Sequence, residues 1–188
     1  MACAQGWDER YRSGSHTTSE PDPFLLELES YRVLLRGSHA LDLACGAGRH
    51  SLALARAGFA VTGIDFSQQG LAIAAERTNG LGVRFINRDL ESSAPEPENE
   101  AYDLVVVFDY LYRPLFEPIR RCLRPSGLVL YKTYMVGSDS GPSNPNYLLR
   151  SNELLGHFEG FRVLRYQEWL AHQPDGRSSA AIIAQKPE

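Results

Sequence analysis

The amino-acid sequence predicts an α/β fold with a doubly wound, mostly parallel sheet and an antiparallel hairpin at its C-terminal edge. Short apolar runs alternate with helical segments over residues 40–133, which is the pattern of successive βαβ units. The run Tyr102–Phe108 is rich in Val and Leu, as expected of a strand that is buried on both faces. A turn at Pro174-Asp175-Gly176 separates two strand-like segments, which predicts the edge hairpin.

The first two thirds of the chain are predicted from hydrophobic spacing and turn residues. Residues 1–23 are polar, and apolar residues then recur at helical spacing before Gly37. Ser67 can cap one helix, and Asn79-Gly80 can end it. The helices expected up to residue 123 are Phe24–Leu35, Arg49–Ala57, Gln68–Thr78 and Leu115–Leu123. The strands expected over the same part are Ala40–Leu43, Phe59–Ile64, Val83–Arg88 and Tyr102–Phe108.

The last third of the chain has a different pattern. The turn Arg124–Gly127 leads into a fifth strand, Leu128–Thr133. Residues 134–147 are rich in Gly, Ser, Pro and Asn and have no periodic signal, so we expect a long loop there. The remaining expected elements are a helix over Leu148–Phe158 and strands over Phe161–Trp169 and Ala180–Ala184.

The composition excludes several classes of protein. The chain has 188 residues, of which 43% are hydrophobic and 22% charged, as in a globular domain. Its formal net charge of -4 provides no global basic field for nucleic acid or an anionic membrane. Cys3, Cys45 and Cys122 form no C-x-x-C pair, so we expect neither a disulfide framework nor a metal site. The start is charged by Asp8, and the longest apolar run, Leu104–Phe108, is too short to span a bilayer. We therefore expect a soluble, cytoplasmic protein.

A glycine turn followed by a series of acids is the first chemical signal. Gly46 and Gly48 stand where a strand meets a helix, which is where doubly wound sheets bind ligands. Asp65, Asp89 and Asp109 each end one of the next three strands, so their carboxylates would line the same rim. One such turn can be a plain connection, and one such acid can be a solvated strand end or a helix cap. The series favours a nucleotide site, with Asp65 placed to bind ribose hydroxyls.

The charge near the turn indicates which nucleotide would bind. Ser51 stands where a dinucleotide loop has its third glycine, and no Lys-Ser/Thr pair follows the glycines, as a P-loop would require. Asp42, just before the turn, would repel a pyrophosphate and attract a cation. S-adenosylmethionine has an ammonium and a sulfonium and no phosphate, so it fits this charge.

Together these residues resemble the class I S-adenosylmethionine-dependent methyltransferases. The segments that match their motifs, in order, are Asp42–Gly48 (with Ala44 in place of the first glycine), Ile64-Asp65, Arg88–Leu90, Tyr102–Val105 and Leu123–Gly127. Those similar to the small TehB-like (tellurite-resistance) group are Trp7–Tyr11, Glu20–Leu25, Gly46–Ser51, Asn152–Leu154 and Phe161–Tyr166. The resemblance implies a Rossmann-like sheet of seven strands, the seventh antiparallel. The chain length suits one domain over residues 1–188, in which a lid and helix (1–36) and an acceptor segment (134–188) flank the cofactor-binding core (40–133).

The resemblance assigns roles to the residues of the cofactor site. Asp42, Ala44, Gly46 and Gly48 would line the methionine end of S-adenosylmethionine, and Arg49 would open a helix beside it. Asp65 would bind the ribose hydroxyls. The residues implied at the adenine are Phe66, Asp89 and Leu90, and those implied beside the methyl group are Phe108 and Asp109.

Methyl transfer is an in-line displacement in which the protein mainly aligns the reacting groups and excludes water. A thiolate or chalcogen oxyanion needs no general base, whereas an alcohol or amine does. Asp109 is the candidate base, with a structural role as the alternative. Arg113 is the candidate grip for an anionic acceptor, because a guanidinium binds oxyanions through paired N–H groups. A solvated surface charge is the alternative for Arg113 and, more strongly, for Arg177.

Residues 134–147 are too many for a bare connection in so compact a fold. With Trp7–Tyr11 they are predicted to form a lid over the cofactor, and a disordered surface loop is the alternative. The candidate acceptor residues are Trp7, Tyr11, Tyr112, Tyr134 and Arg177. His50 is predicted to pack against the cofactor loop and not to act as a catalyst.

The sequence therefore favours methyl transfer to a small nucleophile, with a thiol or chalcogen oxyanion as the first candidate. Among enzymes, the alternative is O- or N-methylation of a small metabolite. Outside enzymes, the alternative is a regulator that binds the cofactor without turnover. We expect a small-molecule acceptor, no nucleic-acid or membrane partner, and a monomer or homodimer.

Overall fold

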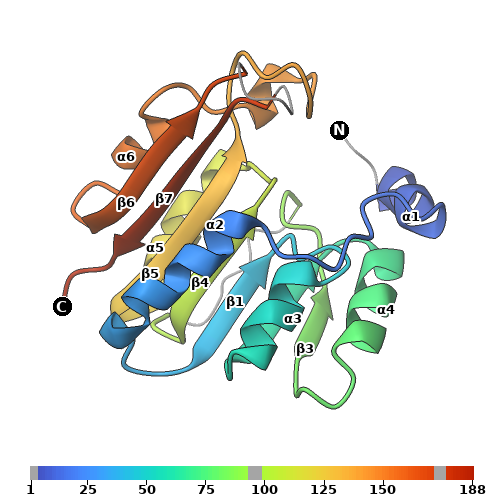
Figure 1. The fold of residues 1–188 in the computed structure, drawn as a ribbon, viewed down its shortest axis with the longest axis horizontal. Coiled ribbons are helices and arrows are strands. Elements are labelled where there is room, and N and C mark those ends of the chain that lie inside the picture. The colour runs from blue at the N-terminus through green and yellow to red at the C-terminus, as the bar shows by residue number, and fades with distance from the viewer. Residues whose placement is uncertain (1–3, 93–98, 172–176) are drawn as a thin grey trace.

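The computed structural model describes residues 4–92, 99–171 and 177–188, which contain one sheet of seven strands (Figure 1). The strand order is β3-β2-β1-β4-β5-β7-β6; the first five are parallel, and β7 is antiparallel to both β5 and β6. The strands are β1 (His39–Leu43), β2 (Ala60–Asp65), β3 (Arg84–Asn87), β4 (Tyr102–Phe108), β5 (Leu123–Tyr134), β6 (Arg162–Trp169) and β7 (Ser179–Gln185). The predicted sheet with its antiparallel edge is confirmed. The turn predicted at residues 174–176 lies outside the described residues.

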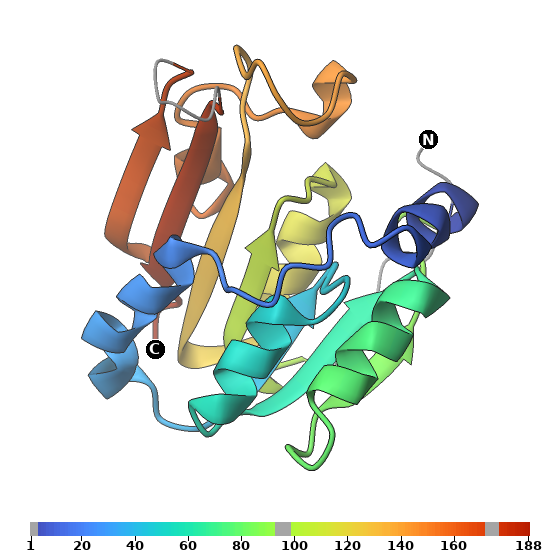
Figure 2. The ribbon, with the colours of Figure 1, turned by 45° about the vertical axis from the view of Figure 1, so that its right-hand side comes forward.

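Helices cover both faces of this sheet (Figures 1 and 2). One face carries α2 (Pro23–Leu26), the 3₁₀ helix η1 (Glu27–Leu34), α3 (Arg49–Arg56) and α4 (Gln68–Arg77); the other carries α5 (Phe116–Cys122) and α6 (Glu153–His157). Side chains of β4 alternate between the two cores, with Leu104 and Val106 on the first face and Val105 and Val107 on the second. This double burial is why β4 reads as a continuous apolar run. Of the helices described, none combines the length and the apolar character needed to cross a bilayer.

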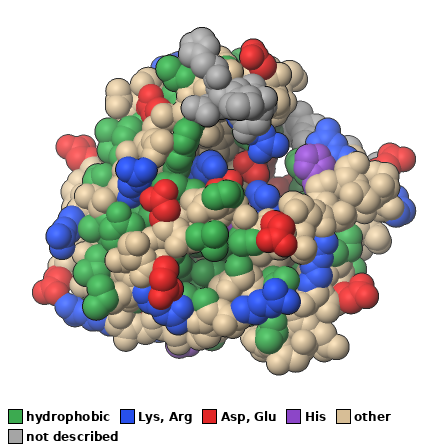
Figure 3. All heavy atoms as spheres, viewed as in Figure 1, with side chains coloured by type: hydrophobic (Ala, Val, Ile, Leu, Met, Phe, Trp, Pro, Cys, Tyr) green, Lys and Arg blue, Asp and Glu red, His purple; other side chains and the backbone are tan. Residues whose placement is uncertain are grey.

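The connections predict a crevice at the carboxyl ends of β1 and β4. The chain passes from β1 to β2 and β3 through α3 and α4 on one face, and from β4 to β5 through α5 on the other. The strand order therefore reverses between β1 and β4, which is the switch point where α/β sheets bind ligands. On the face drawn in Figure 3, acidic and basic side chains gather around a hollow between the upper loops and the N-terminal helix.

Several elements differ from their sequence predictions, and β5 begins at Leu123, before the turn expected at Arg124–Gly127. Residues expected in a polar lead form α1 (Ala4–Arg12), which contacts α4 (Figure 2). The helix expected over residues 24–35 is one α-helical turn followed by η1. The helix expected from Leu148 begins only at Glu153, because Leu149 pairs with Met135 at the end of β5. The expected loop over residues 134–147 contains the short 3₁₀ helix η3 (Pro145–Tyr147).

Candidate functional site

The turn after β1 is built on left-handed backbone. Ala44, Gly46 and Gly48 have φ angles of 56°, 52° and 76°. A methyl group on Gly46 would overlap the Tyr11 hydroxyl, and one on Gly48 would lie 2.6 Å from the Cβ of Ala74. Both positions therefore require glycine for space as well as for conformation. The turn is thus held close to α1 and α4, and its backbone borders the crevice.

Asp65 joins the turns that follow β1 and β2. Its Oδ2 accepts a hydrogen bond from the Gly46 N–H and its Oδ1 accepts one from the Ser67 N–H, both at 2.8 Å. The residue is 6% exposed, and burial raises its pKa although both N–H donors act in the opposite direction. The acid is therefore fixed at the carboxyl end of β2, the position at which the sequence predicts the ribose-binding residue.

Asp42 lies beneath the glycine turn and is 1% exposed. The Ser51 hydroxyl donates to its Oδ2 at 2.6 Å, which gives a function to the serine that replaces a third glycine. Burial raises the pKa of Asp42 to about 7. Within the described part of the chain no side chain forms an ion pair with it. A buried acid without a paired cation favours a ligand with a positive group at this end of the crevice.

The end of β4 carries the residues predicted beside the methyl group. Phe108 stacks on the His50 imidazole with ring centroids 3.9 Å apart. Asp109 follows with a φ of 55° and accepts a hydrogen bond from Arg49 Nη2 at 2.8 Å. Burial raises the pKa of Asp109, and Arg49 partly opposes this. The structure thus joins Arg49 and Asp109, predicted for different roles, in one ion pair.

Sequence reasoning missed a second ion pair at this end of the sheet. Lys132 Nζ on β5 donates to both carboxylate oxygens of Asp22, at 2.9 and 2.8 Å, and lies 5.0 Å from the Trp169 ring centroid. The Asp22 backbone N–H donates to His50 Nε2 at 3.2 Å. Burial lowers the pKa of His50 to about 2, so its ring is neutral. The signal for this pair was a lysine inside the apolar run Leu128–Thr133.

The residues predicted at the adenine follow β2 and β3. Leu90 is buried, whereas Asp89 is exposed and its Oδ1 accepts a hydrogen bond from the Glu91 N–H at 2.8 Å. Phe66 is half-buried, and its carbonyl accepts a hydrogen bond from Asn87 Nδ2 at 2.9 Å. β2 is parallel to β1 and β3 is parallel to β2, so these residues lie on the same edge of the sheet as Asp65.

Helix α1 brings two of the predicted acceptor residues to the glycine turn. Asp8 accepts hydrogen bonds from Ser67 Oγ at 2.6 Å and from the Gln69 N–H at 3.2 Å, which fixes α1 on the first turn of α4. Tyr11 is 8% exposed, and burial raises its pKa, so the phenol stays protonated. Trp7 lies beside Tyr11 with ring centroids 5.9 Å apart.

Tyr134 and Arg177 lie together, whereas Tyr112 lies in a different environment. The guanidinium carbon of Arg177 lies 5.8 Å from the Tyr134 ring centroid, and its charge acts to lower the pKa of Asp109. Tyr112 donates instead to the carbonyl of Glu91 at 3.2 Å, in the loop after β3. Tyr134 and Arg177 are therefore associated with the Asp109 side of the crevice, whereas Tyr112 is associated with the side predicted to hold adenine.

Arg113 is directed toward the segment that follows β5. Its Nε and Nη2 donate to the Glu153 carboxylate at 2.7 and 3.0 Å. Its Nη1 and Nη2 donate to the carbonyls of Asn146 and Leu148 at 2.7 and 3.0 Å. Burial raises the pKa of Glu153, but hydrogen bonds, that from Arg113 first among them, lower it to about 2. These contacts favour a positioning role, and the predicted grip on an acceptor stays a prediction.

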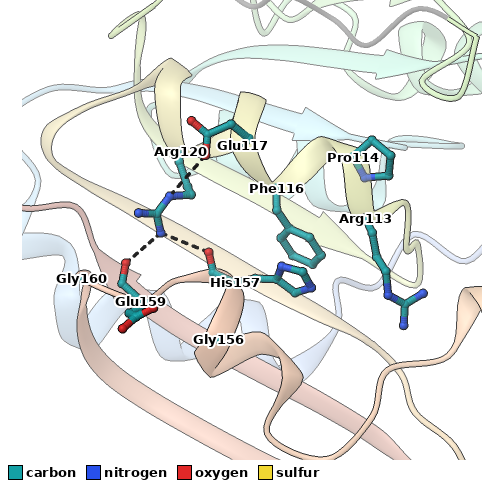
Figure 4. Close-up of a pocket in the computed structure, with 9 residues that line it drawn as sticks. All are labelled: Arg113, Pro114, Phe116, Glu117, Arg120, Gly156, His157, Glu159 and Gly160. Carbon is teal, nitrogen blue, oxygen red and sulfur yellow. Dashed lines mark hydrogen bonds and ion pairs between the residues drawn. The ribbon is translucent and has the colours of Figure 1, made fainter.

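An open groove of about 590 Å³ lies between α5 and α6 (Figure 4). Arg113 and Arg120 both border it, and Phe116 stacks on His157 within it, with ring centroids 3.7 Å apart. None of the predicted cofactor residues lines this groove. The candidate site is therefore the crevice at the carboxyl ends of β1 and β4.

Sequence comparison agrees with this geometry. Residues 40–127 match the family described as a methyltransferase domain. The chain is 33% identical over 139 residues to the ubiquinone biosynthesis O-methyltransferase of Pseudomonas putida (strain F1). That match covers 70% of this chain and 59% of the relative, so the chain spans about three fifths of the length of the protein it matches.

Solved structures share the fold at low sequence identity. TehB from Haemophilus influenzae superposes with a TM-score of 0.73 and 23% identity, over 95% of this chain and 67% of that chain. Phosphoethanolamine N-methyltransferase 2 of Haemonchus contortus, solved in complex with S-adenosyl-L-methionine, gives a TM-score of 0.70 and 18% identity, over 99% of this chain and 58% of that chain. Residues 40–127 of this chain therefore resemble a methyltransferase domain, and the chain shares the fold of these solved structures.

Proposed function

We propose that this protein transfers the methyl group of S-adenosylmethionine to a small nucleophile. The observation that carries the proposal is the buried Asp42 beneath a left-handed glycine turn, with Asp65 fixed beside it. Carboxylates at these places fit an ammonium group and ribose hydroxyls, and they do not fit a pyrophosphate. The family and the S-adenosylmethionine-bound structural neighbour support the same cofactor.

In this proposal the protein binds the cofactor, aligns the acceptor with its methyl group and excludes water. Asp42 and the turn at Gly46 hold the methionine end, and Asp65 holds the ribose. When bound, the cofactor supplies an electrophilic methyl group on its sulfonium. The stacked Phe108 and His50 rings form an apolar wall at the end of β4, and Tyr11 covers the glycine turn. Alignment and removal of water are the main contributions that such a site makes to methyl transfer.

The charges around Asp109 make an anionic acceptor the first candidate. The positive charges of Arg49, Lys132 and Arg177 all act to lower the pKa of Asp109. Basic side chains near the end of β4 favour a thiolate or a chalcogen oxyanion, neither of which needs a base. The second candidate is an alcohol acceptor. It is supported by the raised pKa of Asp109, which could take the proton, and by the name of the P. putida relative.

Formation of S-adenosylhomocysteine in the presence of different acceptors tests the proposal. We expect turnover with small thiols, selenite or tellurite. The Asp109→Asn variant should retain such turnover, because an anionic nucleophile needs no base, whereas it should lose turnover of an alcohol. Binding of the cofactor with no turnover of any acceptor would favour a regulator, and failure to bind S-adenosylhomocysteine would refute the proposal.

A further inference from the structure

The loops that follow β3 and β5 meet at the carboxyl edge of the sheet. Tyr147, at the end of η3, donates its phenolic hydrogen to the Glu91 carboxylate, at 3.2 Å from Oε1 and 3.4 Å from Oε2. In the sheet, β2, β1 and β4 lie between β3 and β5. The contact therefore joins loops whose strands lie on the two sides of the switch point between β1 and β4, where a ligand of the sheet would lie.

The Tyr147 side of the contact is fixed by Arg113. The guanidinium donates to the carbonyls of Asn146 and Leu148, which flank Tyr147 on either side, at 2.7 and 3.0 Å. The same guanidinium is oriented by its two hydrogen bonds to Glu153. One side chain thus sets the position of the backbone on both sides of the tyrosine.

The Glu91 side is fixed in a similar way. Its N–H donates to Asp89 Oδ1 at 2.8 Å, and its carbonyl accepts the Tyr112 hydroxyl at 3.2 Å. Glu91 and Tyr147 are both half-buried. Burial and the facing carboxylate raise the pKa of Tyr147, so the phenol remains a donor at neutral pH. The contact is therefore a bond between two positioned groups and not a chance meeting of mobile side chains.

We propose that Tyr147 and Glu91 form a clasp across the crevice that retains the cofactor, and that Arg113 is the positioning residue that holds Tyr147 in the clasp. This inference rests on the proposed cofactor site. A nucleotide leaving the crevice has to pass a bond that the free protein also contains. Loss of the bond should therefore speed dissociation of the nucleotide while changing the stability of the free protein little.

The dissociation rate of S-adenosylhomocysteine, measured by stopped-flow displacement, tests the clasp. Tyr147→Phe removes the donor alone, and we expect dissociation about fivefold faster, the factor that follows from one lost hydrogen bond. Glu91→Gln should speed dissociation in the wild type but add nothing in the Tyr147→Phe background, because the two side chains share one bond. Additive effects, or an unchanged rate with a lowered melting temperature, would overturn the clasp.

A matched pair of arginines tests the positioning role. Arg113→Lys should speed dissociation, because an ammonium cannot make the four hydrogen bonds of the guanidinium. Arg120→Lys is the control, since Arg120, on α5, also donates to two carbonyls, those of His157 and Glu159 at 3.1 and 2.9 Å (Figure 4). Dissociation of S-adenosylhomocysteine from Arg120→Lys should be as fast as from wild type. Equal acceleration by both variants would overturn the role of Arg113.

The outcomes separate the clasp from the function it depends on. Wild-type protein that does not bind S-adenosylhomocysteine would overturn the proposed function and the clasp with it. If S-adenosylhomocysteine binds but its dissociation rate is the same in Tyr147→Phe as in wild type, the clasp alone is overturned. Should Arg113→Lys fail to fold, the Tyr147→Phe and Glu91→Gln cycle decides the question.

Discussion

Ala44 has a backbone conformation that is unfavourable for a residue with a Cβ. Its φ of 56° lies in the left-handed region, which costs an L-residue about 1–2 kcal/mol. We expect Ala44→Gly to raise the free energy of unfolding by about 0.5–1 kcal/mol, because glycine removes this strain but loses more entropy on folding. Urea denaturation measures the change. Ala47→Gly in the same turn, at a φ outside the left-handed region, should instead destabilise the protein, and a gain at both positions would contradict the explanation.

Asp42 predicts a pH dependence of cofactor affinity. Burial raises its pKa from 3.8 to about 7, so in the free protein the carboxyl is mainly neutral below that pH and ionised above it. A cationic ligand binds the ionised form, so binding below pH 7 releases a proton. The affinity for S-adenosylhomocysteine should therefore increase up to about tenfold per pH unit below neutrality and level off above it. Calorimetry across this range should show the slope in wild type and none in Asp42→Asn; an unchanged slope in the variant would assign it to another group.

Single residues could be predicted where their role is local. Gly46 and Gly48 were predicted to form a tight turn because a strand and a helix meet there, and the structure gives both left-handed φ angles. Asp65 was placed at the end of a strand because the β-branched run before it stops there. The partners of Arg113 lie 33 to 40 residues further along the chain, where no local spacing points to them.

At the scale of elements, α1 is held by its contacts with α4. Asp8 is the main link, through the Ser67 hydroxyl and the Gln69 N–H. We expect Asp8→Ala to release α1, seen as faster hydrogen exchange of residues 4–12, and to weaken binding of S-adenosylhomocysteine by roughly 1 kcal/mol as Tyr11 leaves the glycine turn. Glu9→Ala, at an exposed position on the same helix, is the control and should change neither measurement. Faster exchange with unchanged binding would show that α1 is not part of the cofactor site.

The elements that the sequence did not predict are those fixed by distant partners. α1 is highly charged, and its aromatic residues Trp7 and Tyr11 alone do not make a helical apolar stripe, so only its contact with α4 explains it. The apolar residues at 148 and 149 fit a helix locally, yet Leu149 exchanges backbone hydrogen bonds with Tyr134 and Val136. The strands were predicted well, because burial on two faces leaves a clear apolar run in the sequence.

For the molecule as a whole, the two edges of the parallel sheet have different roles. The carboxyl edge holds buried acids, left-handed backbone at Ala44 and Asp109, and ion pairs between segments far apart in the sequence. Each of these features costs stability or offsets another, which is typical of functional sites. The amino edge holds one charged group whose contacts join the starts of three strands.

That group is Asp103, and it should matter for stability and not for binding. It is 4% exposed and accepts hydrogen bonds from the His39 N–H and from Arg124 Nη1, both at 2.9 Å, which joins the starts of β4, β1 and β5. Asp103→Ala leaves these donors without their acceptor, and we expect a loss of about 2–3 kcal/mol in the free energy of unfolding.

The position of Asp103 in β4 explains why binding should be spared. Asp109 lies six positions further along the chain, which at the rise of a strand is about 20 Å. Urea denaturation with and without S-adenosylhomocysteine measures both quantities, because a ligand that binds the folded state stabilises wild type and variant equally when its affinity is the same. Arg36→Ala, which breaks the exposed pair with Glu188, is the control and should change stability by less than about 0.5 kcal/mol. A smaller stabilisation by ligand in Asp103→Ala would mean that the two edges of the sheet are coupled through β4.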